Sequence, residues 1–145
     1  MEMIVLAPDI YVNASVALDS PPEQVARRVL DAKRGPSKTS EWVLTRVEQM
    51  LRALPEFRGE AIDKQLSLIR GLVEVVAMPD MPAQDWAAAL VTTAKAAGAR
   101  RVVTDHPDLL SIAEREGIEF MSSEAWLLES ATPPPPPARA SQRPS

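Results

Sequence analysis

The chain has 145 residues, and 46% of them are hydrophobic. A chain of this length and composition can bury one hydrophobic core but is too short for two domains. It contains no cysteine and a single histidine, which excludes a disulfide framework, a thiolate zinc site and a histidine-rich metal site. Any metal would therefore be bound mainly by oxygen, as magnesium and manganese are, while the net charge of −4 argues against a general duplex-binding protein.

Apolar runs of strand length alternate with helical patterns along the chain, an order typical of a parallel α/β sheet with right-handed crossovers. The patterns predict strands over residues 3–7, 72–78, 101–104 and 118–121. They predict helices over residues 22–33, 40–54, 60–70, 84–97, 107–116 and 123–128. Gly71 and Gly98 are expected to end two of these helices.

The composition changes at Ser130, and an unbroken proline run covers residues 133–137. This predicts one domain over residues 1–129 and a disordered, proline-rich tail over residues 130–145. The tail is either a ligand for a proline-recognising partner or a plain flexible extension. The first apolar run is too short for a signal peptide or a membrane span, so we expect a cytoplasmic protein that does not contact a membrane.

Two aspartates follow predicted strands. Asp9 comes after the first strand and Asp105 after the third, and the carboxyl ends of parallel strands meet at one edge of a sheet. Carboxylates gathered there could hold a divalent cation that activates water, which suggests metal-dependent nuclease chemistry. The alternative for Asp9 is that it only caps the turn after its strand.

In order and spacing, these pieces resemble a PIN domain, the small α/β nuclease fold of many bacterial toxin-antitoxin toxins and RNA-processing enzymes. The resemblance covers about residues 4–127 and rests on five features. The first three are the aspartate closing the first strand, the helix from Ser40 to Leu51, and the alanine-rich helix leading through Ala97-Gly98-Ala99 into Val-Val-Thr. The other two are Asp108-Leu109-Leu110 at the next helix start and the closing segments Gly117-Ile118-Glu119-Phe120 and Ser122-Ser123-Glu124-Ala125-Trp126-Leu127. It implies a three-layer α/β/α fold with a central, mainly parallel sheet of about four to five strands.

The resemblance also implies a function. Active members of the family hold magnesium or manganese with several acids and use the metal to activate water for attack on an RNA phosphodiester. The implied partners are RNA, a protein antitoxin or regulatory partner, and a second copy of the chain in a homodimer.

The family's first three acid positions fall on Asp9, Arg46 and Ala87 of this chain. Near Arg46, the candidate is Glu41, which either reaches the site through a changed register or is a first-turn acid favoured by the helix dipole. Near Ala87, the candidate is Asp85, which is either a substitute ligand or the N-cap of the alanine-rich helix.

At the last positions, His106 stands where active relatives often carry an aspartate, and Asp108 matches a further acid. Asp105 either substitutes through a one-residue shift of the loop or caps the helix that follows. His106 is a proton carrier, a neutral metal ligand or a polar turn residue, and Asn13 is a second auxiliary candidate. We thus predict catalytic acids at Asp9, Glu41, Asp85 and Asp105, and metal ligands at Asp9, Asp105 and Asp108.

Two leading functions stay open, beside a third possibility, a small α/β interaction protein unrelated to nucleases. The first is a toxin-like, magnesium- or manganese-dependent endoribonuclease, which the retained Asp9 favours. The second is a degenerate PIN-like domain without catalysis that acts as a binding or regulatory module, which Arg46 and Ala87 favour. Trp42 and Trp86 either stack on bases or pack in the core or an interface.

Overall fold

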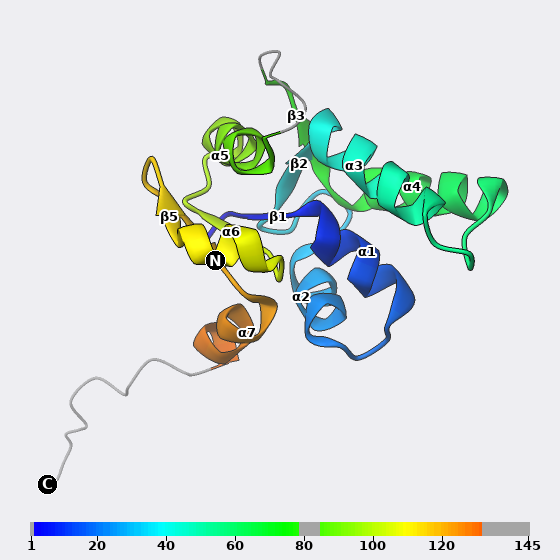
Figure 1. Ribbon diagram of the computed structural model, residues 1–145, viewed down its shortest axis with the longest axis horizontal. Helices are drawn as coiled ribbons and strands as arrows, with labels where there is room; N and C mark the ends of the chain where they lie inside the picture. The colour runs from blue at the N-terminus through cyan, green and yellow to red at the C-terminus, as the bar shows by residue number, and fades with distance from the viewer. Residues whose placement is uncertain (1, 79–84, 132–145) are drawn as a thin grey trace, which may run out of the picture.

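The computed structural model describes residues 2–78 and 85–131, in which helices and strands alternate (Figure 1). Four strands form a mixed sheet in the order β1 (Ile4–Leu6), β4 (Arg101–Val103), β6 (Ile118–Met121) and β5 (Glu114–Arg115). The first three of these run parallel, and β5 runs antiparallel to β6. Beside them lies a two-stranded parallel sheet of β2 (Lys38–Ser40) and β3 (Glu74–Val76). The α/β class is thus confirmed, and the predicted mainly parallel sheet of four to five strands is matched in part, by a mixed sheet of four strands.

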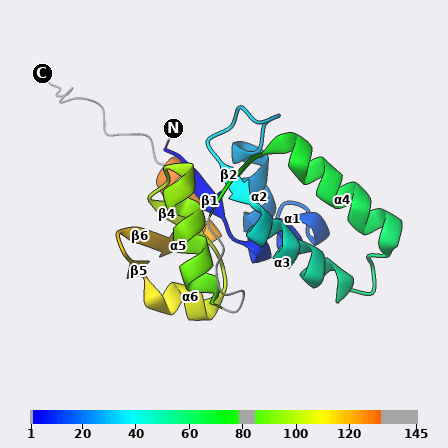
Figure 2. The same cartoon turned by 90° about the horizontal axis from the view of Figure 1, so that it is seen from above.

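A single parallel bridge between Ile4 and Ser37 connects the two sheets, so β1 has neighbours on both edges. The seven helices of the described residues are α1 (Pro8–Val16), α2 (Pro21–Val29), α3 (Glu41–Arg52), α4 (Gly59–Leu72), α5 (Trp86–Ala97), α6 (Pro107–Ile112) and α7 (Ser123–Ala131). In Figure 1, α5 lies on one side of β1, and α2 and α7 lie on the other. Seen from above in Figure 2, α3 and α4 lie beside β2, away from α5.

Local signals explain most helix boundaries. The Ser40 side chain accepts a hydrogen bond from the Val43 N–H at the start of α3, as a capping serine should. Gly98 ends α5 in the left-handed conformation with φ of 74°, which a residue without a Cβ adopts at little cost. Gly71, predicted to end a helix, lies inside α4, which continues to Leu72.

Five elements differ clearly from the sequence prediction, and one of them is α2, which ends at Val29 and not at residue 33. Helix α1 was not predicted, and it begins at Pro8, so Asp9 lies in a first helical turn and not at a strand end. The short strands β2 and β5 were also not predicted. The helix predicted over residues 107–116 ends at Ile112, because the chain turns back at Ala113, where φ is 66°, to form β5. Of the turn predicted over residues 78–82, residues 79–82 lie outside the described residues, and so does the predicted helix start at residue 84.

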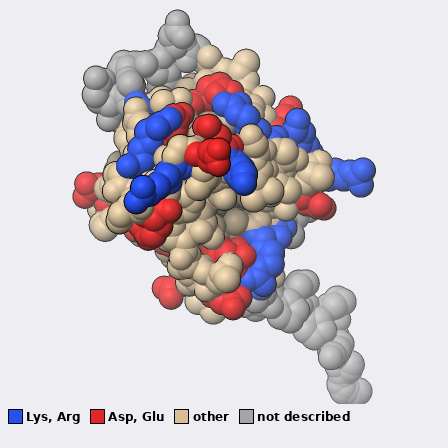
Figure 3. Space-filling view, turned by 90° about the vertical axis from the view of Figure 1, so that its right-hand side faces the viewer, with Lys and Arg blue, Asp and Glu red and all other residues tan. Residues whose placement is uncertain are grey.

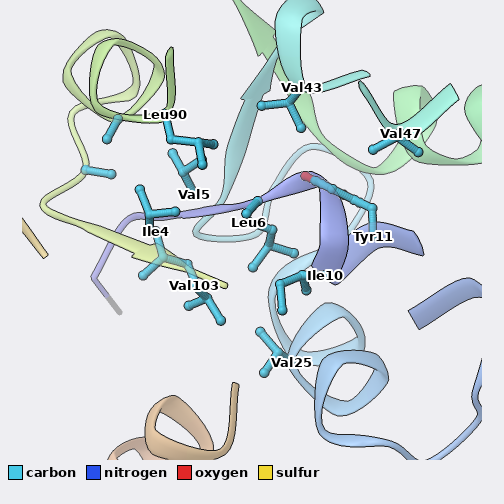
Figure 4. Close-up of a cluster of buried hydrophobic side chains, with 14 of the residues drawn as sticks. Ile4, Val5, Leu6, Ile10, Tyr11, Val25, Val43, Val47, Leu90 and Val103 are labelled. Atoms are coloured by element: carbon cyan, nitrogen blue, oxygen red, sulfur yellow. The ribbon is translucent and has the colours of Figure 1, made fainter. Parts of the chain in front are cut away.

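The hydrophobic core lies on both sides of β1 (Figure 4). Its residues Ile4, Val5 and Leu6 are completely buried. Leu90 of α5 lies on one side of the strand, and Val25 of α2 lies on the other. Burial of each such aliphatic side chain contributes roughly 1.5–3 kcal/mol, so β1 is fixed in place, and with it the start of α1.

Two further predictions concern the end of the chain and the membrane. Helix α7 continues to Ala131, past the predicted domain boundary at residue 129, and the rest of the predicted tail lies outside the described residues. None of the helices in residues 2–78 and 85–131 has the length and apolar character needed to cross a bilayer.

Candidate functional site

Asp9, the first of the predicted acids, lies in a helical turn and not at the end of a strand. It lies in the first turn of α1, immediately beyond β1, and is only 7% exposed. The Thr104 hydroxyl donates a hydrogen bond to Asp9 Oδ1 at 2.9 Å, and the backbone N–H of Asp105 donates one to Oδ2 at 2.8 Å. Because Thr104 and Asp105 follow β4, the expected meeting of these two strand ends is present.

Burial has an electrostatic effect on Asp9. Loss of solvation raises the pKa of the Asp9 carboxyl above its ordinary value, and the negative charge of Asp105 raises it further. The hydrogen bonds from Asp105 and Thr104 favour the ionised form and oppose this shift. These two hydrogen bonds satisfy the carboxylate oxygens in their buried position.

The Asp105 side chain is used elsewhere. Its Oδ1 accepts from the backbone N–H of Ser123 at 2.8 Å, and its Oδ2 accepts from the Ser123 hydroxyl at 2.6 Å. Ser123 is the first residue of α7, so Asp105 satisfies a free N–H at the start of that helix. The prediction that Asp105 caps the helix directly after it is wrong, because the cap of α6 is His106.

His106 is a polar turn residue in this structure. Its Nδ1 accepts a hydrogen bond from the Asp108 N–H at 3.2 Å, which caps α6, and its own N–H donates to Thr104 Oγ1 at 3.1 Å. Since Nδ1 accepts, the proton of the neutral ring is on Nε2. Asp108 lies exposed in the first turn of α6, and within the described residues its carboxylate has neither a hydrogen bond nor an ion pair.

The other predicted acids make contacts away from Asp9. Glu41 forms a two-point ion pair with Arg70 of α4, with N–O distances of 2.7 and 2.9 Å, and this pairing lowers the pKa of Glu41. Asp85 accepts from the Ala88 N–H at 2.9 Å and is the N-cap of α5. Asn13 is exposed on α1. For Glu41 and Asp85, the structure therefore agrees with the helix-start alternatives.

The donor set does not suit a hard divalent cation. Within residues 2–78 and 85–131, no three acidic or histidine side chains are grouped so that they could share a metal ion. Magnesium and manganese need several oxygen ligands around one point. Arg46 and Ala87 stand where the resemblance to PIN domains would place two further acids. Arg46 lies over the ring of Trp42, 5.0 Å from its centroid, and Ala87 is buried in the core.

The sequence did not indicate two contributors, Thr104 and Ser123, whose hydroxyls hold the carboxylates of Asp9 and Asp105. A hydroxyl residue directly after a buried strand is a weak signal for the first, and the second follows only from the packing of α7. An aromatic row of Trp42, Trp86 and His106 also lies at this edge of the sheet.

Charge around the molecule is mixed. Figure 3 shows the face on which α1, α3 and α4 lie, where Lys and Arg side chains alternate with Asp and Glu. Ion pairs within α3 and between α3 and α4 include Arg52 with Glu48 at 2.5 Å and Arg70 with Glu41 at 2.7 Å. This face therefore lacks the uniform basic surface that duplex binding favours.

The chain was compared with protein-family models and with curated proteins, and neither comparison finds a match.

Proposed function

We propose that this chain is a PIN-like domain. Support comes from the three parallel strands β1, β4 and β6, from β2 beside β1, and from helices on both sides of β1. Asp9 follows the central strand, and Thr104 at the end of β4 holds it, as expected for an acid at the carboxyl edge of such a sheet. A three-layer domain with a central, mainly parallel sheet accounts for these features.

The function that the geometry supports best is a binding or regulatory module without catalysis. One observation carries this conclusion: Glu41, Asp85 and Asp105 each use their carboxylates in contacts away from Asp9. Glu41 pairs with a basic residue, and the other two satisfy helix starts. Asp9 is then a buried structural acid, and the bound partner is RNA, a protein such as an antitoxin, or a second copy of the chain.

A second candidate is a toxin-like, magnesium- or manganese-dependent endoribonuclease. The observation that favours it is the arrangement around Asp9, whose carboxylate lies next to the backbone of Asp105, shortly before Asp108 in the first turn of α6. A carboxylate that accepts two hydrogen bonds retains two further lone-pair sites. This function would require Asp105 to give up Ser123 and turn toward Asp9.

Two measurements on the full chain decide between these functions. Calorimetric titration with manganese and cleavage of a labelled single-stranded RNA are run on the wild type and on Asp9→Asn. Asp63→Asn, an exposed acid of α4, is the matched control. The binding module predicts no metal site at millimolar manganese and no cleavage. Manganese binding and cleavage that both disappear in Asp9→Asn, and persist in Asp63→Asn, would establish the nuclease instead.

A further inference from the structure

We propose that a hollow at the start of α6, next to the segment of Thr104 and Asp105 that binds Asp9, binds an unpaired nucleobase of RNA. The hollow has a volume of about 240 Å³ and is lined by Trp86, His106, Asp108 and Leu109. Pockets for drug-sized ligands have volumes of about 300–1,000 Å³, so this one suits a smaller planar group. The inference rests on the proposed function, since it names what the binding module binds.

The wall of the hollow is aromatic and held in place. Trp86 packs edge-to-face against Trp42, with ring centroids 5.6 Å apart and an interplanar angle of 87°. The His106 ring also lies near Trp86, with the ring centroids 5.8 Å apart and an interplanar angle of 47°. Trp86 is half-buried, so part of its ring stays accessible while both neighbours fix its orientation. Stacking of a base on such a ring increases affinity by about fivefold to a hundredfold.

The polar groups of the hollow select the kind of base. The free Asp108 carboxylate only accepts hydrogen bonds, and the Nε2–H of neutral His106 is a donor. A base that carries amino hydrogens can donate hydrogen bonds to this carboxylate. Guanine is the best match, because its N1–H and amino group point the same way and can both reach one carboxylate, whereas uracil offers a single N–H.

Charge argues that the base enters the hollow and the phosphate stays outside. Asp108 lines the hollow, and Asp9 and Asp105 lie in the same region, so a phosphate there would meet like charge. The hydrogen-bonding edge of a base is free only when the base is unpaired. The ligand is therefore a single-stranded or looped-out guanine, and duplex RNA is excluded.

The test follows the three tryptophan indole N–H signals of ¹⁵N-labelled full-length protein in NMR titrations without divalent metal. GMP, UMP and a short single-stranded RNA that contains guanine are added separately. The Trp126 signal is the internal control, because this side chain is buried in α7 and does not line the hollow. We expect GMP to shift the Trp86 signal with saturation, UMP to bind about tenfold more weakly, and the Trp126 signal to stay in place.

Two variants give the inference a direct check. Asp108→Asn should reduce GMP affinity about tenfold and leave UMP affinity nearly unchanged, because it removes the charged acceptor. Trp86→Leu should abolish GMP binding measured by calorimetry, while Trp126→Phe should retain it. Equal, unsaturated shifts with GMP and UMP, or unchanged GMP binding in Trp86→Leu, would overturn the inference.

The outcomes separate this inference from the proposed function. Manganese-dependent cleavage that is lost in Asp9→Asn would refute the binding-module proposal. The base site would still stand if the Trp86 signal responds to GMP. If RNA binds and the Trp86 signal does not move, the proposed base site is refuted and the binding-module proposal stands. A chain that binds neither GMP nor RNA refutes the base site and makes a protein the partner of the module.

Discussion

Replacing Asp105 by alanine tests whether this acid is a structural residue or a metal ligand. The side chain accepts two hydrogen bonds from Ser123, one of them from a backbone N–H at the start of α7. Loss of a helix cap costs about 0.5–2 kcal/mol, and hydrogen bonds to a charged group contribute about 1.5–3 kcal/mol each. Because Asp105 is only partly buried, we expect Asp105→Ala to lower the free energy of unfolding by about 2–3 kcal/mol.

Urea denaturation followed by circular dichroism measures this change, with metal chelated throughout. A shift of the midpoint at constant slope reports a loss of stability without a change in the denatured state. Asp108→Ala is the matched control, since that acid lies three residues further on without a partner among the described residues, and it should change stability by less than about 0.5 kcal/mol.

The sign of the effect distinguishes the two roles. If Asp105 were a metal ligand turned toward Asp9, its removal without metal would relieve repulsion between two acids and stabilise the protein. A stabilised Asp105→Ala variant would therefore refute the structural assignment. A double-mutant cycle with Ser123→Ala should give a coupling of about 1 kcal/mol, because both changes remove the same hydroxyl contact.

Three other outcomes follow from the structure. The raised pKa of Asp9 means that the folded state holds a proton that the unfolded state loses above the ordinary value of 3.8, so stability falls as pH rises through this window. Asp9→Asn should therefore become more stable relative to wild type as the pH is raised above 3.8 in urea titrations. Gly71→Ala should stabilise α4 by about 0.5–1 kcal/mol in thermal melts, because a Cβ there meets nothing within 4 Å. Gly35→Ala should instead destabilise the protein, because its Cβ would lie 1.9 Å from the carbonyl oxygen of Val29 at the end of α2. Finally, Ala87→Asp combined with His106→Asp should create manganese binding in calorimetry if these are the family's acid positions, and no gain in a folded variant would count against the PIN-like proposal.

Elements with local signals could be predicted from the sequence. The helix after Ser40 has both a capping side chain and an apolar stripe, and the alanine-rich helix ends at Gly98 as expected. Helix α1 could not be predicted in this way. Its first five residues are all buried, so it lacks the polar face that reveals a helix by periodicity. The strands β2 and β5 have three and two residues, and only their partner strands define them.

The candidate site, too, could be predicted from the sequence only in part. That Asp9 and the residues after β4 meet follows from the rule that parallel strands end at one edge, and the sequence was sufficient for it. Where the Asp105 side chain points was not predictable, because its partner Ser123 comes 18 residues later and is brought near by the packing of α7. Among the alternatives left open for Glu41 and Asp85, the structural one could be chosen only once Arg70 and the start of α5 were located.

The position of β1 has a consequence for synthesis of the protein. Among the described strands this one is synthesised first, yet its Ile4 pairs with Arg101, and β6 must follow before the other edge of β4 is covered. At translation rates of about 5–20 residues per second, the nascent strand waits roughly 5–20 s for its partner. During that time its apolar side chains and open backbone are accessible to chaperones, so folding is completed only when nearly all of the domain has been made.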